Sequence, residues 1–131
     1  MADQKDRPVS PHITIWRWGP HMAVSIIHRV TGAGLTIVGL AVLTWWLMAL
    51  AYGPEPYAAF TRFSGSWIGL VILIGLTWAF FQHLLSGVRH LVMDTGSGFE
   101  IGVNKRFAVL TLVGSVVLTA ALWVYLLEHK P

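Results

Sequence analysis

The chain has 131 residues, of which 55% are hydrophobic and 11% are charged, and its formal net charge is +3. A soluble domain of this size needs more surface charge, so the composition indicates an integral membrane protein built as one compact helical unit. The absence of cysteine excludes disulfides, iron–sulfur ligation by this chain and thioether attachment of c-type haem.

Residues 1–20 are predicted to form an N-terminal segment at the membrane interface. Asp3, Lys5 and Asp6 interrupt its beginning, and it has no apolar core of the kind that a signal peptide needs. These acidic residues also differ from the composition of a transit peptide. With Met1 in place, we expect a bacterial cytoplasmic (inner) membrane, with the mitochondrial inner membrane less favoured.

Three apolar segments approach or exceed the length of about 20 residues that crosses a bilayer. They run over about residues 21–50, 67–93 and 107–127. Between the first two, the sequence Gly-Pro-Glu-Pro at 53–56 indicates a turn or loop. The predicted fold is an all-α membrane protein with three transmembrane helices, forming a single membrane-anchor domain over residues 1–131.

The basic residues predict that the N-terminus lies inside and the C-terminus outside, because short inner loops are enriched in lysine and arginine. In that orientation the inner side holds Lys5, Arg7, Arg17, Arg29, Arg89, Lys105 and Arg106. The outer side holds only Arg62 and Lys130. The inner half of the first span and the inner half of the second then lie at similar depth, so their polar residues are expected to meet.

In the second span, His83, Gly87, His90 and Asp94 are separated by four, three and four residues, which places them on one helical face. Ionisable groups at membrane depth are costly and commonly functional. Gly87 removes side-chain bulk one turn from His83, as a flat macrocycle with an imidazole-ligated iron would require. The alternative is that Gly87 allows close helix packing and that His83 bonds to a neighbouring helix.

The first span carries a second polar face, made of Ser25, Arg29, Gly32, Thr36 and Gly39, with His28 beside it. A buried guanidinium needs a carboxylate, another anion or carbonyl oxygens, so a haem propionate or a quinone carbonyl would suit Arg29. Ser25 could donate to the same molecule. The alternative is that Arg29 extends to the inner interface with its stem along apolar surface.

Structural roles are predicted for the remaining polar residues of the spans. Arg89 is expected to be a positive-inside anchor, and Asp94 is expected to cap the turn that follows. The stripe of Thr111, Ser115 and Thr119 in the third span is expected to be a helix-packing seam. No phosphate-binding loop or zinc-protease histidine pair is present, and nothing indicates nucleic-acid binding.

Three motifs together resemble the cytochrome b subunit family of succinate dehydrogenase, respiratory complex II. They are Arg-Pro-Val-Ser-Pro-His at 7–12, Ser-Ile-Ile-His-Arg-Val-Thr-Gly at 25–32, and the stretch from His83 to Gly96. The resemblance covers the N-terminal segment and the first two spans in order and at the family's spacing. The third span matches only in position and hydrophobicity.

The resemblance implies that His83 is an axial ligand of a b-type haem whose second axial histidine comes from a partner membrane subunit. It further implies that His28 and His90 lie near the haem, with His28 and Arg29 close to its propionates. Ser25 and Arg29 would help to form the ubiquinone pocket. The one-face spacing described above adds Gly87 to the residues expected at the haem.

The resemblance also implies three partners: a second membrane anchor subunit, an iron–sulfur subunit and a flavoprotein subunit. FAD and the iron–sulfur clusters would be confined to the partner subunits, which pass electrons from succinate towards ubiquinone. The chain would contribute to the quinone reduction site without being catalytic alone. Three alternatives stay open: an anchor of a related quinol:fumarate reductase, a structural anchor without haem, and haem ligation within the chain by His28 and His83.

Overall fold

The computed structural model describes residues 18–129 and consists of helices joined by short connections. The elements are α1 (Pro20–Gly34), the π-helical segment η2 (Leu35–Gly39), α2 (Leu40–Tyr52), α3 (Pro54–Ser64), α4 (Trp67–Asp94) and α5 (Ile101–Glu128). Most of the predicted interfacial segment, and the motif at 7–12, lie outside the described residues.

Three continuous helical stretches are long and apolar enough to cross a membrane. They are Pro20–Tyr52, which combines α1, η2 and α2, and the single helices α4 and α5. At 1.5 Å per residue, the 28 residues of α4 extend about 42 Å, which exceeds the hydrocarbon thickness of about 30 Å. The predicted all-α fold with three transmembrane helices is confirmed.

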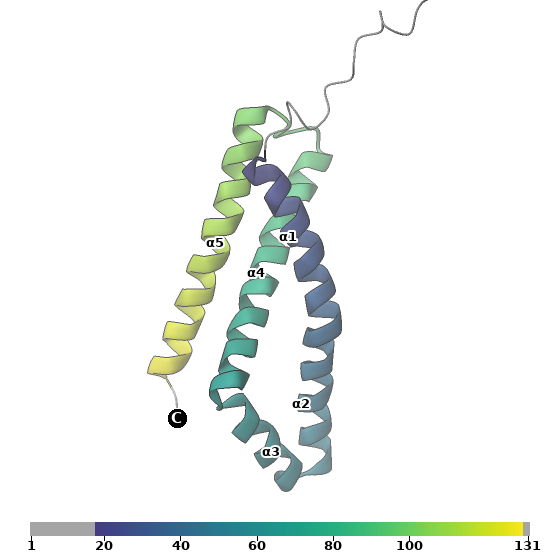
Figure 1. Cartoon of the computed structure of the whole chain (residues 1–131), viewed down its shortest axis with the longest axis vertical. Helices are drawn as coiled ribbons and strands as arrows, with labels where there is room; N and C mark the ends of the chain where they lie inside the picture. The colour runs from purple at the N-terminus through teal and green to yellow at the C-terminus, as the bar shows by residue number, and fades with distance from the viewer. Residues whose placement is uncertain (1–17, 130–131) are drawn as a thin grey trace, which may run out of the picture.

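The helices pack closely at one end of the molecule and separate towards the other (Figure 1). Helix α4 contacts both α1 and α5, and α1 also contacts α5. The start of α1 and the α4–α5 loop lie together at this end, which we call the loop end (Figure 1). Towards the opposite end α2 leaves α4, and the short helix α3 connects the two.

The connection between the first two spans differs from the predicted loop, because residues 54–64 form helix α3. Gly53 ends α2 with a φ of 105°, a conformation that favours glycine. The two prolines that follow occupy the first turn of α3, where a missing amide hydrogen is tolerated. Glu55 in the first turn and Arg62 in the last turn both suit the helix dipole.

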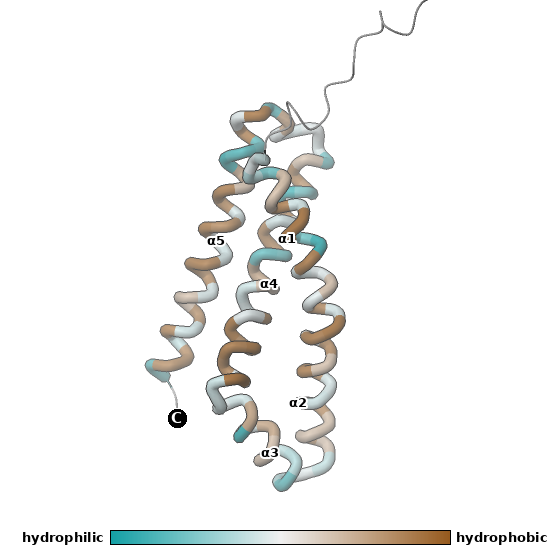
Figure 2. The backbone as a smooth tube through the Cα atoms, viewed as in Figure 1, coloured by the Kyte–Doolittle hydropathy of each residue, from teal (hydrophilic) through white to brown (hydrophobic). Residues whose placement is uncertain are grey.

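Most apolar side chains point outward, as expected for a surface that meets lipid or other helices. Figure 2 shows hydrophobic residues along α4 and α5, with several hydrophilic residues gathered near the loop end. The seam between α4 and α5 is instead lined by the small residues Thr111, Ser115 and Thr119, all buried. The hydroxyl of Ser115 donates to Oε1 of the buried Gln82 at 2.8 Å. The predicted helix-packing seam is confirmed.

Candidate functional site

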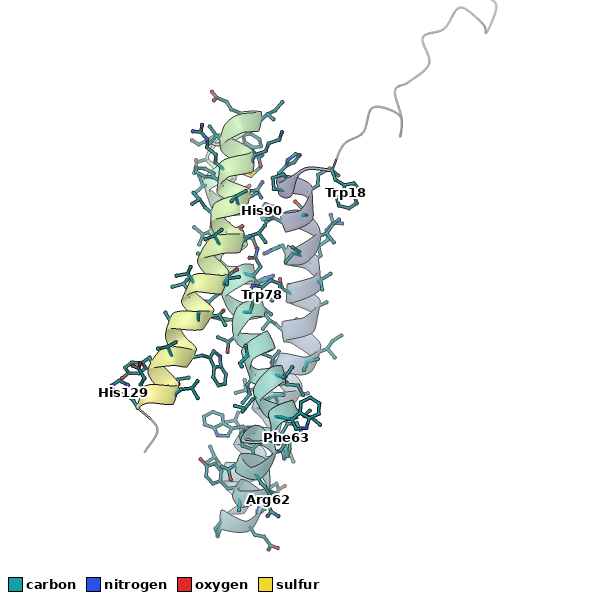
Figure 3. The ribbon with its side chains drawn as sticks, turned by 60° about the vertical axis from the view of Figure 1, so that its left-hand side comes forward. Trp18, Arg62, Phe63, Trp78, His90 and His129 are labelled. Carbon is teal, nitrogen blue, oxygen red and sulfur yellow. The ribbon has the colours of Figure 1, made fainter. Side chains whose placement is uncertain are left out.

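Helices α1 and α4 bring three histidines together in the half of the bundle nearer the loop end. The ring of His28 stacks on the ring of His83, with centroids 3.9 Å apart and an interplanar angle of 7°. His90, two turns after His83 and nearer the loop end, places its ring 5.3 Å from that of His28 at 55° (Figure 3). The expectation that the polar residues of the two spans meet therefore holds for these three side chains.

The imidazole of His83 is fixed by α1 through one of its two nitrogens. Its Nδ1 lies 3.1 Å from the backbone carbonyl oxygen of His28 and 3.4 Å from the hydroxyl of Thr31. A carbonyl oxygen only accepts, so the hydrogen bond to it places the proton on Nδ1. The lone pair of Nε2 is then free, and this is how proteins orient a histidine that ligates a metal.

Gly32 makes room for this ring on the surface of α1. A Cβ atom built on Gly32 would lie 2.9 Å from Cε1 of His83, closer than real Cβ contacts allow. The sequence placed Gly32 on a polar face but did not assign it to the site. The only sequence feature that linked Gly32 to the site was its position one turn after His28, and a glycine that merely allows helix packing could occupy the same position.

His28 is held by Ser86, a residue that the sequence analysis did not single out. Nδ1 of His28 lies 2.6 Å from the hydroxyl oxygen of Ser86, which is fully buried. That hydroxyl is also 2.7 Å from the carbonyl of Gln82, to which it donates. Since a hydroxyl has one proton, His28 is the donor in the bond to Ser86. The serine was missed because a small polar residue in a span usually serves packing.

The predicted face of α4 is only partly directed at the histidine cluster. A Cβ atom on Gly87 would meet Cε1 of His28 at 3.8 Å, so the space beside this glycine faces the His28 ring. Asp94 is exposed at the last residue of α4. The turn beyond it is held by Thr95, whose hydroxyl donates to the carbonyl of Val92 at 2.7 Å.

A pocket of about 360 Å³ adjoins the histidine cluster on the side of the loop end. Its lining combines α1, α4 and the first turn of α5: His21, Met22, Ser25, Ile26, Arg29, Arg89, His90, Met93 and Asn104. Ser25 is half-buried and donates to the carbonyl of His21 at 3.1 Å, whereas Arg29 is exposed. The structure thus brings the predicted residues Ser25, Arg29 and His90 to one pocket.

Arg89, for which the sequence suggested a positive-inside anchor, is a buried residue that is only 5% exposed. Its Nη2 donates to Oδ1 of Asn104, so the side chain reaches across from α4 to α5. The inner-side placement of Arg89 stays a prediction, whereas its burial was not predicted, because the sequence does not reveal which side of α4 is covered by α5.

The described residues contain no group of three or more histidine, aspartate or glutamate side chains suited to a bare metal ion. A haem iron needs fewer protein ligands, since the macrocycle supplies four, and the free Nε2 of His83 fits an axial ligand. Two axial ligands must approach iron from opposite sides. The rings of His28 and His83 instead lie face to face, which disfavours iron ligation by both within this chain.

These features define a three-span helical membrane protein with an oriented histidine cluster beside a polar pocket near one end. Residues 3–122 match the profile of the family described as succinate dehydrogenase/fumarate reductase transmembrane subunit. The chain belongs to this family, which confirms the resemblance seen in its motifs, and it is a membrane subunit of that kind of complex.

Individual relatives agree with the family. The chain is 40% identical over 120 residues to the succinate dehydrogenase cytochrome b556 subunit of Paracoccus denitrificans, covering 90% of this chain and 92% of the relative. It is 35% identical over 118 residues to the subunit of the same name from Rickettsia felis, covering 90% and 91%. It is also 32% identical over 121 residues to the mitochondrial cytochrome b560 subunit of Sus scrofa, covering 89% and 70%.

Proposed function

We propose that this chain is the haem b-binding and ubiquinone-binding membrane anchor subunit of a succinate dehydrogenase. In this role it passes electrons from succinate oxidation to quinone within a bacterial cytoplasmic membrane. Membership of the family and the bacterial relatives support the anchor role. The observation that carries the haem assignment is the orientation of His83, whose Nδ1 is bound by α1 and whose Nε2 has no hydrogen-bond partner among the described residues.

His83 is the proposed axial ligand, with the second ligand supplied by another membrane subunit. Two observations support a shared site: the relatives are named cytochrome b subunits, and the stacking of His28 on His83 disfavours iron ligation by both histidines of this chain. His28, Gly87 and His90 are the proposed neighbours of the haem, and Arg29 would pair with its carboxylates. The bound haem would supply one-electron chemistry, and the protein sets its position and electrostatic environment.

The pocket at the loop end is the proposed site of the ubiquinone head group. Arg29 supplies a positively charged donor suited to the carbonyl oxygens of a quinone, and the hydroxyl of Ser25 would turn from the His21 carbonyl to donate to them. In a water-excluded site such donors stabilise negative charge that develops on those oxygens. The iron–sulfur subunit would complete this pocket, and the flavoprotein subunit would hold FAD and oxidise succinate.

The basic residues support placing the loop end on the inner side of the membrane. Arg29, Lys105 and Arg106 lie in or next to this end, whereas Arg62 lies on α3 at the opposite end (Figure 3). Short inner segments are enriched in such residues. The iron–sulfur and flavoprotein subunits would then dock from the inner aqueous phase, next to the quinone pocket.

The haem assignment is tested by a reduced-minus-oxidised absorption spectrum of the purified complex. We expect a b-type band in the wild type and its loss or a clear shift in His83→Ala. His129→Ala is the matched control, because His129 is exposed at the far end of α5 (Figure 3). A wild-type complex without the band would favour a structural anchor, and an unchanged band in His83→Ala would remove His83 as the ligand.

The family description also includes fumarate reductases, so the direction of the reaction needs its own measurement. We expect succinate oxidation with ubiquinone to exceed fumarate reduction with the corresponding quinol. The reverse ratio in the purified complex would identify an anchor of a quinol:fumarate reductase.

A further inference from the structure

Arg89 is a cation buried within the membrane-spanning part of the chain. It lies five residues before the end of α4, about 8 Å along the helix axis, and is 5% exposed. Its guanidinium has five N–H donors and no acceptor. Nη2 donates to Asn104, whereas Nε and Nη1 are buried without a hydrogen-bond partner among the described residues.

The charge of Arg89 is therefore not compensated by the part of the chain that the structure describes. Asn104 is neutral, and it satisfies only one nitrogen. A buried charge without an opposite charge or carbonyl oxygens is strongly unfavourable, particularly at membrane depth. Extension of the side chain to the interface does not resolve this, because the guanidinium is buried while Arg29, Lys105 and Arg106 are exposed.

The unused donors belong to a residue that lines a pocket. Arg89 and Asn104 both line the 360 Å³ pocket that also contains Ser25 and Arg29. A second buried nitrogen in the same lining, Nδ1 of His21, also has no hydrogen-bond partner within residues 18–129. Two side chains that line the pocket, from different helices, thus carry buried nitrogens without a hydrogen-bond partner among the described residues.

We propose that Arg89 is a ligand-binding residue of this pocket and that Asn104 is the residue that positions it. The ligand group is an oxygen acceptor with partial or full negative charge. On the function proposed above, on which this inference rests, that oxygen comes either from the quinone head group or from a haem carboxylate. Arg89 then provides a second cation, more buried than Arg29, and Asn104 of α5 fixes the plane of its guanidinium.

The test compares variants of the complete, purified complex. Arg89→Gln removes the charge, Arg89→Lys retains it without the planar fork, and Asn104→Ala removes the positioning contact. Arg106→Gln is the matched control, because it removes an exposed cation two residues from Asn104. The readouts are the KM and kcat for a short-chain ubiquinone, succinate oxidation by a dye acceptor, haem content and the haem midpoint potential.

If the oxygen belongs to the quinone, Arg89→Gln should raise the quinone KM about tenfold or more and leave the haem potential unchanged. If it belongs to the haem, the midpoint potential should fall, because a nearby positive charge favours the reduced form. In both cases Asn104→Ala should act in the same direction but less strongly, Arg89→Lys should be intermediate, and dye reduction and Arg106→Gln should match the wild type.

The inference is overturned if Arg89→Gln and Asn104→Ala lower thermal stability but leave the quinone KM and the haem potential at wild-type values. If Arg89→Gln does not assemble, Arg89→Lys and Asn104→Ala decide the question, and wild-type values in both overturn it. Failure of the proposed function has a different signature, because the wild-type complex itself would then lack the haem band or quinone reduction.

Discussion

The imidazole of His28 lies flat against the imidazole of His83, with 3.9 Å between the ring centroids. The backbone carbonyl of His28 also accepts the hydrogen bond from Nδ1 of His83. One residue of α1 thus contacts a single ring on α4 through both its side chain and its backbone. The orientation of His83 depends on how α1 packs, and a change in α1 should be visible in the spectrum of a bound haem.

Gly32→Ala is expected to displace the imidazole ring of His83 while leaving that residue itself unchanged. The new Cβ would lie 2.9 Å from Cε1 of His83, so the ring must move away from α1 and weaken its hydrogen bond to the His28 carbonyl. We expect an altered b-type spectrum and midpoint potential, or reduced haem content. Gly34→Ala is the control, because a Cβ there meets nothing within 4 Å. Equal spectra for both variants would contradict the role of Gly32.

Ser25→Ala and Arg29→Leu are expected to separate quinone reduction from succinate oxidation. Each removes a donor from the pocket, and a hydrogen bond from a charged group is worth about 1.5–3 kcal/mol, so we expect quinone activity to fall roughly tenfold or more for Arg29→Leu. Succinate oxidation by a dye acceptor should persist, and Arg29→Lys should recover part of the quinone activity. Parallel loss of both activities would point to failed assembly.

Gly69→Ala is expected to damage the corner between α3 and α4. A Cβ on Gly69 would lie 2.1 Å from the carbonyl oxygen of Phe63, and backbone must move to relieve this overlap. We expect a loss of about 1–3 kcal/mol or more, measured as a lower thermal midpoint of the purified complex. Gly75→Ala on the same helix has open space and should match the wild type; a similar loss there would exclude the corner as the cause.

Ser115→Ala is expected to weaken the α4–α5 seam. It removes the 2.8 Å hydrogen bond to Gln82 and leaves a fully buried amide without that partner. Bonds between membrane helices average about 0.6 kcal/mol and reach about 2 kcal/mol, so we expect a small but measurable drop in thermal stability. Thr61→Ala, which removes an exposed hydroxyl of α3, should have no effect.

The sequence predicted the three spans because their apolar runs are long. It predicted the histidine cluster because the distribution of lysine and arginine placed the polar residues of the first and second spans at the same membrane depth. It did not predict α3, since prolines in a first helical turn resemble those of a loop. Gly32 and Ser86 were missed because a small residue in a span gives the same sequence signal whether it only packs against a neighbouring helix or also positions a functional side chain. The burial of Arg89 depends on where α5 packs, which local periodicity does not reveal.

The π-helical segment Leu35–Gly39 sets the rotation of α2 relative to α1 within the continuous first span. The amide of Leu40 donates to the carbonyl of Leu35, five residues earlier, so this turn holds one residue more than an α-turn. Deleting one residue there would leave the span long and apolar enough to insert. It would also turn α2 by about 100° relative to His28, which would carry Val42, Leu43 and Trp46 away from the pocket that they line together with α4.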